Sequence, residues 1–417
     1  MIPEHLPERL TISLWDFSWY TRAGAGEPFA DLDTVFAETV QRGYNAVRIC
    51  AAPLLTFGGL GLDPRIAISG LGDAPDGGRY GRGTRWYDVT GGYEIDVRER
   101  LVELVRAAAR HGVVVILASW EYQQSPAFAA TPDWWNAIDA VPLDDRYDVL
   151  AAAFDRMLQT FDAEGLLESV AFTELHNEVD FSRVPPLADR GARAVEWLES
   201  RHPAQLFSAS YGKPPHLDMA TVSPAMRVAQ FHIYTYGVLD ALQQRIDLRS
   251  EGSAGFPNDE LHSLLVDGAP TFADYGRPEA WRMHATVITD QMVYGYDFID
   301  PAKWDAWLLE RYPAFRDEMH NEMAARITGV AAWARSRGVP QVIGEGWIGY
   351  TPLHGDFEEG AVGLELAEHG IRTALDAGAW GMVLCSNAAP HHPMWSNVDW
   401  QQRMNAEILA HAGQPVA

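Results

Sequence analysis

Short apolar stretches recur eight times along the chain, and the segments between them carry apolar residues at the helical period. The stretch 113–118 is apolar throughout, which is typical of a parallel strand buried on both faces. The eight stretches predicted as strands are 10–15, 46–50, 113–118, 170–178, 205–210, 227–234, 341–347 and 380–387.

The segments between these strands predict helices. The first begins after Asp31, a suitable N-cap, and stops at Gly43. Leu32, Val35 and Phe36 lie on one of its faces. A helix between two strands makes the strands parallel, and repeated units of this kind predict an α/β protein, a (β/α)8 TIM barrel, as a single domain over 1–417. The other predicted barrel helices are 96–110, 145–164, 187–201, 303–335, 359–377 and one after 395.

Two long insertions interrupt this rhythm. The first, about 56–93, follows the second strand and is rich in glycine. The second, about 235–320, follows the sixth strand and has helical periodicity over 238–247 and 278–294. Both leave the carboxyl end of a strand, where barrels keep their chemistry, so we expect them to cover the active face.

Two of the strands end in a glutamate. Glu178 closes the fourth strand and Glu345 lies in the seventh, roughly across the mouth of a barrel. Hydrolysis of a glycoside needs one carboxylic acid to protonate the leaving oxygen and a second carboxylate to attack or to activate water. The order and placement of these residues predict a two-carboxylate glycosidase site.

Polar residues on neighbouring strands suit the same site. Asn177 is placed to bind a sugar 2-hydroxyl, and His232 to bind the sugar or to orient Glu178. Arg48 and Tyr234 are expected to hold Glu345 ionised and to lower its pKa.

The pattern resembles clan A of the glycoside hydrolases, near family 5, the cellulase-like retaining β-glycosidases. The resemblance rests on 47–49, 175–178, 231–234 and 343–346, and covers roughly 10–400 outside the insertions. It implies Glu178 as acid/base, Glu345 as nucleophile, and Asn177 as a substrate ligand.

The chain departs from the family pattern in three places. Val179 stands where a proline usually follows Asn-Glu, and Ser119-Trp120 replaces a histidine at the end of the third strand. At the end of the eighth strand Ser386-Asn387 stands in place of the usual tryptophan, and Trp395 on the next loop is a candidate substitute. Asn387 and Trp395 are both predicted to bind the substrate.

Aromatic residues are abundant, with 15 Trp and 15 Tyr. Those on strand ends and loops are candidate stacking platforms for sugar rings, with core packing as the alternative for each. The candidates are Trp15, Trp19, Trp120, Trp347 and Trp395. The two long insertions, which are expected to overhang the active face, favour exo action on short glycosides in a closed pocket.

The amino-acid composition limits the kinds of molecule that the protein is expected to bind. The net charge is −25, from 57 acidic and 32 basic residues, which argues against nucleic acid and anionic membranes and suits a small carbohydrate or glycoside. Cys50 and Cys385 lie in apolar runs, as buried free thiols do. No secretory signal and no apolar run of 18 residues is seen, so we expect a cytoplasmic protein, or a secreted one if a leader was removed. Oligomeric state, sugar and linkage are not predicted.

Other functions fit less well. The pair His391-His392 has no metal-ligand spacing with another histidine or glutamate, so we expect no metal and no cofactor. The glycines of 56–93 do not join a strand to a helix, which argues against a phosphate loop. A lyase or aldolase lacks a lysine at a strand end. A non-catalytic, sugar-binding cellulase-like barrel stays open as the alternative.

Overall fold

A computed structural model describes residues 2–412 of the chain, except 251, 253, 350, 351 and 353. Nine strands form one parallel sheet in the order β7-β6-β5-β2-β1-β11-β10-β9-β8. Their bounds are β1 Leu10–Asp16, β2 Ala46–Cys50, β5 Val114–Ala118, β6 Val170–Glu174, β7 Phe207–Ser208, β8 Ser210–Tyr211, β9 Ala229–Thr235, β10 Gln341–Ile348 and β11 Gly381–Val383. The predicted (β/α)8 barrel is confirmed.

The fifth strand of the barrel is divided into two short pieces. The register pairs Thr173 of β6 with Phe207 of β7, and Ser210 of β8 with Gln230 of β9. Only Ala209 lies between the two pieces, so the chain changes its hydrogen-bonding neighbour there and the sheet closes. The prediction of one continuous strand over 205–210 is therefore corrected.

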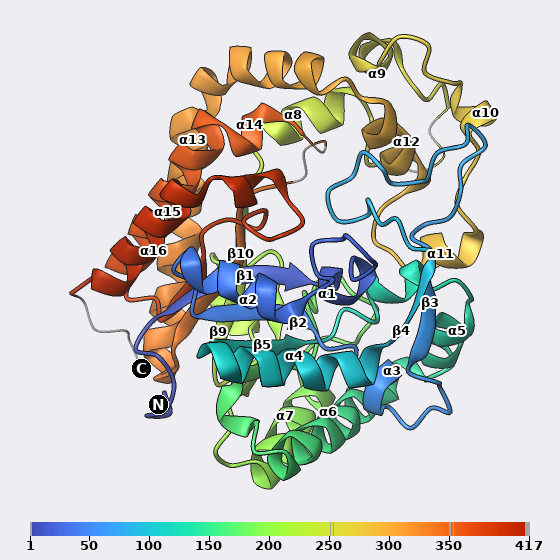
Figure 1. Cartoon of the computed structure of the whole chain (residues 1–417). Helices are drawn as coiled ribbons and strands as arrows, with labels where there is room; N and C mark the ends of the chain where they lie inside the picture. The colour runs from blue at the N-terminus through green and yellow to red at the C-terminus, as the bar shows by residue number, and fades with distance from the viewer. Residues whose placement is uncertain (1, 251, 253, 350–351, 353, 413–417) are drawn as a thin grey trace.

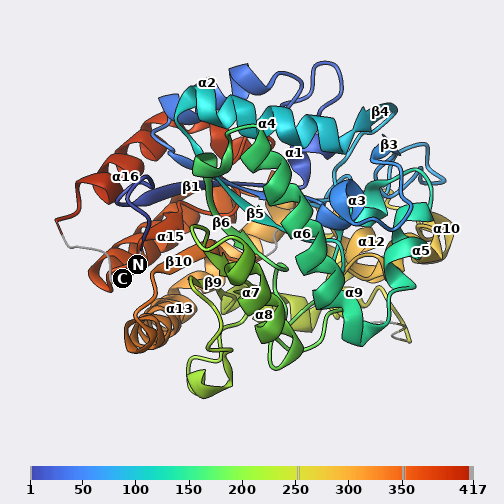
Figure 2. The same ribbon diagram turned by 90° about the horizontal axis from the view of Figure 1, so that it is seen from below.

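Helices surround the barrel (Figure 1). In that view α13, α15 and α16 lie on the left, and α4, α6 and α7 below. Figure 2, seen from below, shows α4, α6 and α7 outside β5 and β6. The α-helices are α1 Ser18–Thr21, α2 Leu32–Gln41, α3 Pro53–Phe57, α4 Val97–His111, α5 Asp133–Asp139, α6 Arg146–Ala163, α7 Arg190–Arg201, α8 Val238–Arg245, α9 Asp259–Leu264, α10 Phe272–Tyr275, α11 Ala280–His284, α12 Asp290–Phe298, α13 Pro301–Arg337, α14 Asp356–Glu359, α15 Ala361–Asp376 and α16 Val398–Ala410. Short 3-10 helices cover Ser125–Phe128, Leu143–Asp145, Leu167–Ser169, Met219–Thr221 and Pro393–Ser396.

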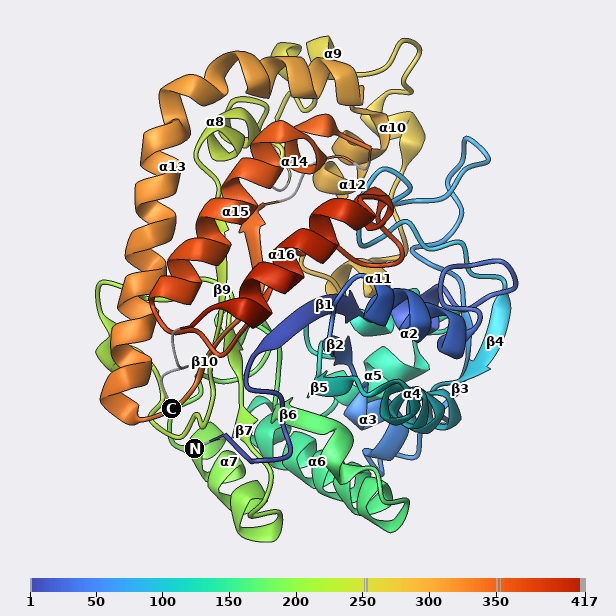
Figure 3. The ribbon, with the colours of Figure 1, turned by 60° about the vertical axis from the view of Figure 1, so that its left-hand side comes forward.

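The longest helix, α13, joins the second insertion to the barrel. Asp300 caps it by accepting hydrogen bonds from the backbone of residues 302 and 303, and Pro301 occupies its first position, where no backbone donor is needed. Pro313 lies inside the helix, and a proline there removes a backbone hydrogen bond and bends the axis. Figure 3 shows α13 as a long arc that runs along the barrel and over the insertion.

The first insertion is not wholly irregular. Its strands β3, Arg65–Ile68, and β4, Tyr93–Asp96, form a separate antiparallel pair. The second insertion holds α8 to α12. The predicted helix over 278–294 is wrong, because α11 ends at His284 and α12 begins at Asp290. The break contains the β-branched run 286–289, which disfavours a helix, and Thr289 caps α12.

The two insertions bind each other. Asp297 of α12 accepts hydrogen bonds from the backbone of Gly81 and Gly83, both at 2.7 Å. The hydroxyl of Tyr80 donates to the carbonyl of Tyr275 at 3.1 Å. In Figure 1 the light-blue first insertion accordingly lies beside α10 and α12. Among the described helices, none is long and apolar enough to cross a membrane.

Candidate active site

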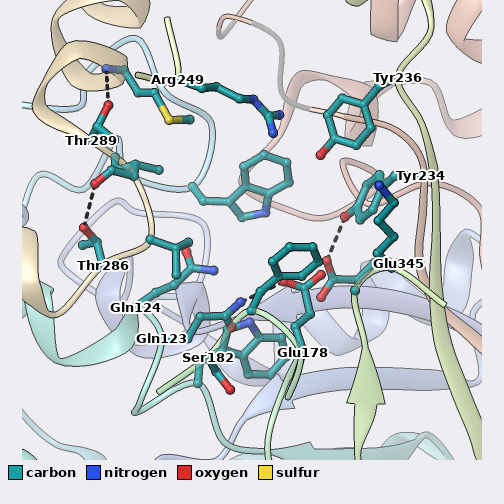
Figure 4. Close-up of a pocket in the computed structure, with 18 of the residues that line it drawn as sticks. Gln123, Gln124, Glu178, Ser182, Tyr234, Tyr236, Arg249, Thr286, Thr289 and Glu345 are labelled. Carbon is teal, nitrogen blue, oxygen red and sulfur yellow. Dashed lines mark hydrogen bonds between the residues drawn. The ribbon is translucent and has the colours of Figure 1, made fainter. Parts of the chain in front are cut away.

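A cavity of about 1520 Å³ lies at the carboxyl ends of the barrel strands. From the barrel it is lined by Asp16, Trp120, Glu178, Tyr234 and Glu345, among others. Both insertions add to its walls. The lining residues from the insertions and from α13 include Trp86, Tyr236, Arg249, Met283, Thr286, Thr289, Phe315, Glu318 and Glu322. Figure 4 shows Glu178 and Glu345 close together, with Arg249 and Thr289 across the cavity.

Arg48 of β2 organises the buried side of the site. Its guanidinium is fully buried and binds both oxygens of Glu174, with Nε and Nη2 at 2.7 and 2.8 Å. Nη1 donates to Oε1 of Glu345 at 2.8 Å, and Nη2 donates to Oδ1 of Asn177 at 2.6 Å. These carboxylates hold the pKa of Arg48 above its ordinary value despite burial. The ring of Trp120 lies 4.5 Å from the guanidinium carbon.

Glu345 receives a second donor on its other oxygen. The hydroxyl of Tyr234 donates to Oε2 at 2.7 Å, and Ser386 lies 2.9 Å behind that hydroxyl. Ser386 itself accepts from the backbone N–H of Gly346 at 2.9 Å. The hydroxyl proton of Ser386 is therefore available to the oxygen of Tyr234. The hydrogen bonds run from Gly346 through Ser386 and Tyr234 to the carboxylate of Glu345.

The pKa of Glu345 departs from the expectation. Burial raises it, while the positive charge of Arg48 and the hydroxyl of Tyr234 act in the opposite direction. The nearby carboxyl of Glu178 raises it further. Arg48 and Tyr234 thus limit a rise in the pKa of Glu345 rather than produce a net fall, which corrects the prediction.

Glu178 follows β6 with a backbone φ of 45°, in the left-handed region that few non-glycine residues adopt. Its backbone N–H donates to Oγ of Ser210 at 2.9 Å. Oε1 lies 2.8 Å from Nδ1 of His232, and Oε2 accepts from Nε2 of Gln123 at 2.8 Å. Burial raises the pKa of Glu178 and lowers that of His232 to about 4, so the imidazole is neutral near pH 7.

The two carboxylates and His232 are close neighbours. One ligand atom from each of Glu178, His232 and Glu345 lies within 4.8 Å of the others. The side chains of Glu178 and Glu345 are 16% and 11% exposed, so both reach the cavity. The arrangement places two carboxyl groups close together in the wall of one cavity.

The same three residues are the described group best placed to hold a metal ion. However, Arg48 and Tyr234 already donate to the two oxygens of Glu345, and Gln123 donates to Glu178. Donors directed at both carboxylates suit negative charge or a bound proton better than a cation.

The family model described as sugar-binding cellulase-like matches residues 12–229 and 261–409, which is most of the chain. The chain belongs to this cellulase-like family. No curated protein sequence matches it.

Solved structures show the same fold. A protein from Parabacteroides distasonis, whose assignment as a glycoside hydrolase is itself provisional, is 18% identical, with a TM-score of 0.67 over 100% of this chain and 96% of its own. Endo-glycoceramidase II from Rhodococcus sp., solved as a lactosyl-enzyme intermediate, is 11% identical, with a TM-score of 0.50 over 96% of this chain and 80% of its own. The predicted resemblance is thus confirmed for the cellulase-like family by the family model and for the fold by these structures.

Most of the tryptophans predicted as sugar platforms lie elsewhere in this cellulase-like barrel. Trp120 lines the cavity. Trp15 is buried against Phe29 and Phe36, and the indole N–H groups of Trp19 and Trp347 donate to backbone carbonyls.

Two predicted substrate ligands, at the end of the eighth predicted strand and on the following loop, also lie outside the cavity lining. The indole of Trp395 donates to Glu38 and packs on Arg42. Asn387 is fully buried outside the cavity lining. The predictions for Trp15, Trp19, Trp347, Trp395 and Asn387 are corrected, because these side chains are buried and none of them lines the cavity.

The structure adds lining residues that the sequence did not single out. They include Gln123, Tyr236, Arg249 and Phe315. Trp86 also lines the cavity, and its place among the glycines and aromatics of the first insertion was the signal for it. No comparable signal marks Gln123, which reaches Glu178 only because the turn after β5 folds back.

Proposed function

We propose that this cellulase-like protein is a glycoside hydrolase that cleaves β-linked glycosides or oligosaccharides with retention of configuration. The proposal rests on the Glu178–Glu345 pair, whose nearest ligand oxygens lie within 4.8 Å across the cavity. Retaining enzymes hold their two carboxyl groups about 5–5.5 Å apart, whereas inverting enzymes need about 6.5–9.5 Å to admit a water.

In the first step, Glu345 attacks the anomeric carbon as the bond to the leaving oxygen breaks. Glu178 transfers its proton to that oxygen, so the leaving group departs as a neutral alcohol. The environments fit these roles, since burial raises the pKa of Glu178 and so favours its protonated form, while Arg48 and Tyr234 favour the charged form of Glu345.

In the second step, Glu178 is a carboxylate and takes a proton from water. The water attacks the anomeric carbon, the bond to Glu345 breaks, and the sugar leaves with its original configuration. Neutral His232 at 2.8 Å stabilises Glu178 in both forms, because its Nδ1 can donate to the carboxylate or accept from the acid.

The walls of the cavity favour exo action on short substrates. The first insertion, the second insertion and α13 all contribute lining residues, and Asp297 ties the two insertions together. A cleft for a long polymer needs open ends, which these segments restrict.

A panel of aryl β-glycosides tests the proposal, with proton NMR to follow the anomer first released. Glu345→Gln should abolish turnover while leaving the fold intact. Glu178→Ala should keep activity only on substrates with good leaving groups, and azide should then yield a β-glycosyl azide. Glu310→Gln, an exposed change on α13, is the matched control. Full activity of Glu345→Gln would exclude the assignment of that residue.

Sugar binding without hydrolysis is the second candidate, because the matching family is described by sugar binding. Calorimetry with the same sugars separates the two functions. Heat of binding without any product from the wild-type protein would select the binding module.

A further inference from the structure

A chain of hydrogen bonds runs from Arg48 to Glu178 through two amides. Nη2 of Arg48 donates to Oδ1 of Asn177 at 2.6 Å. Nδ2 of Asn177 donates to Oε1 of Gln123 at 2.7 Å, and Nε2 of Gln123 donates to Oε2 of Glu178 at 2.8 Å. Arg48, Asn177 and Gln123 are all buried.

Chemistry fixes the direction of each bond. A guanidinium only donates, so the amide atom of Asn177 that faces Arg48 must be its oxygen. Its NH₂ group therefore faces Gln123, which must present its own oxygen. The NH₂ group of Gln123 then faces Glu178, and a carboxylate accepts from it. The arrangement holds whichever way the two amides are drawn.

This chain changes the role of Asn177. The family resemblance implies that Asn177 binds the substrate, but its oxygen is held by Arg48 and its nitrogen by Gln123. Asn177 is 1% exposed and does not line the cavity, whereas Gln123 does. The amide next to the reacting groups is that of Gln123.

We propose that Gln123 is a positioning residue for Glu178, and that it connects the acid/base to the same guanidinium that holds the nucleophile. This proposal rests on the proposed function. Arg48 binds Glu345 directly at 2.8 Å and reaches Glu178 through two amides. A displacement of Arg48 therefore disturbs both glutamates, whereas a change at Gln123 disturbs Glu178 alone.

Gln123 acts on the orientation and on the proton of Glu178. Its N–H group fixes one carboxyl oxygen while His232 contacts the other. Its hydrogen bond also lowers the pKa of Glu178 against the rise that burial causes. The other titratable or charged groups around Glu178 are Arg48, Tyr87, Glu174, Asp180, His232, Tyr234, Tyr236 and Glu345.

Two variants separate the links. Gln123→Glu keeps an acceptor for Asn177 and replaces the donor to Glu178 by a carboxylate oxygen. Gln123→Met removes both links at similar volume. Gln402→Glu makes the same chemical change at an exposed position on α16 and is the control.

For both variants we expect kcat on aryl β-glycosides to fall about 10- to 100-fold, the range for loss of a hydrogen bond to a charged group. KM should change little, and the basic limb of the pH profile of kcat/KM should move to higher pH. A variant that merely loosens the fold would lower the melting temperature and leave that limb in place. Gln123→Glu, which is nearly isosteric, sustains the test if Gln123→Met does not fold.

A second readout does not depend on turnover. Carbon-13 NMR of protein labelled at the glutamate carboxyls, with Glu178→Gln for assignment, follows the titration of Glu178 itself. We expect its pKa to rise in both Gln123 variants. An unchanged titration with an unchanged pH profile would overturn the role of Gln123. A shifted titration in a protein that hydrolyses no glycoside would support the contact and contradict the proposed function.

Discussion

The hydroxyl of Tyr234 binds the oxygen of Glu345 that Arg48 does not bind. It donates to Oε2 at 2.7 Å and is backed by Ser386. A carboxylate that accepts such a bond in a buried site ionises more readily. Tyr234→Phe removes the donor and leaves Ser386 without that partner.

We expect Tyr234→Phe to lower kcat/KM about 10- to 100-fold, the range for a lost hydrogen bond to a charged group. The acid limb of the pH profile, which reports ionised Glu345, should move to higher pH because the hydroxyl holds the pKa of Glu345 down. Tyr312→Phe on α13, whose hydroxyl is 3.4 Å from Glu365, is the matched control. An acid limb that stays in place would contradict this role.

Glu178 makes a second residue-scale prediction, on stability. Burial raises its pKa in the folded protein above the value in the unfolded chain. The native state therefore binds more protons, and its stability falls as the pH rises from the ordinary carboxyl range through the raised value. Glu178→Gln removes this cost, so its melting temperature should exceed that of the wild type by about 1–3 °C at pH 8.

The advantage of Glu178→Gln should disappear below the ordinary carboxyl pKa, where both proteins are neutral at this position. Thermal unfolding followed by circular dichroism between pH 4 and 8 measures it. A variant that is less stable than the wild type at pH 8 would show that Glu178 gains more from its partners than it loses by burial.

The sequence was a good guide to the polar residues that meet at the site and a poor one to which aromatic side chains face the cavity. Glu178, Glu345, Arg48 and His232 meet in the structure because strand order brings their positions together. Side chains alternate between the two faces of a strand, and this rule applies to Trp15 as well. Its neighbours Leu14 and Asp16 line the cavity, so the side chain of Trp15 points away from it. Gln123 could not be predicted, because the fold of the turn after β5 decides where it points.

At the scale of elements, the divided fifth strand explains the unusual Val179. Its backbone N–H donates to the carbonyl of Ser210 at 3.0 Å, a bond that proline cannot make. With the bond from Glu178 to Oγ of Ser210, this fastens the end of β6 to β8. Val179, where the family pattern has proline, thus provides an additional backbone hydrogen bond that holds Glu178 in place.

Gly212, just after β8, is part of this support. A Cβ at this position would lie 2.5 Å from Oε1 of Glu178, too close for either atom to stay in place. We therefore expect Gly212→Ala to push Glu178 away from His232 and to lower kcat by at least about tenfold, since misplacement by about 1 Å is costly in catalysis. Kinetics together with the melting temperature check this, and normal kcat in a folded variant would contradict the steric argument.

Of the two breaks in predicted elements, the sequence signals the one between α11 and α12 but not the one in the fifth strand. The β-branched residues 286–289 mark the end of α11, and this local signal was available. The division at Ala209 has no such signal, because it arises from which neighbours the two halves bond across the closing sheet. Local propensity does not encode that choice.

At the scale of the molecule, the barrel and the two insertions together line the cavity. Their junction is Asp297, which accepts from Gly81, Gly83 and the hydroxyl of Tyr275. Burial raises the pKa of Asp297 to about 6. Asp297 joins the two insertions and does not itself line the cavity, so a change there tests the shape of the pocket apart from its chemistry.

We expect Asp297→Ala to loosen the first insertion against α12 and to raise KM for short aryl glycosides about 5- to 10-fold, comparable to the loss of one or two hydrogen bonds. The value of kcat should change much less, because the contacts of Glu178 and Glu345 do not pass through Asp297. Asp376→Ala, an exposed change at the end of α15, is the control. If the wall restricts the wild type to short substrates, the variant should also gain activity on longer oligosaccharides. Unchanged chain-length preference with raised KM would mean that the insertions bind the substrate without closing the ends of the site.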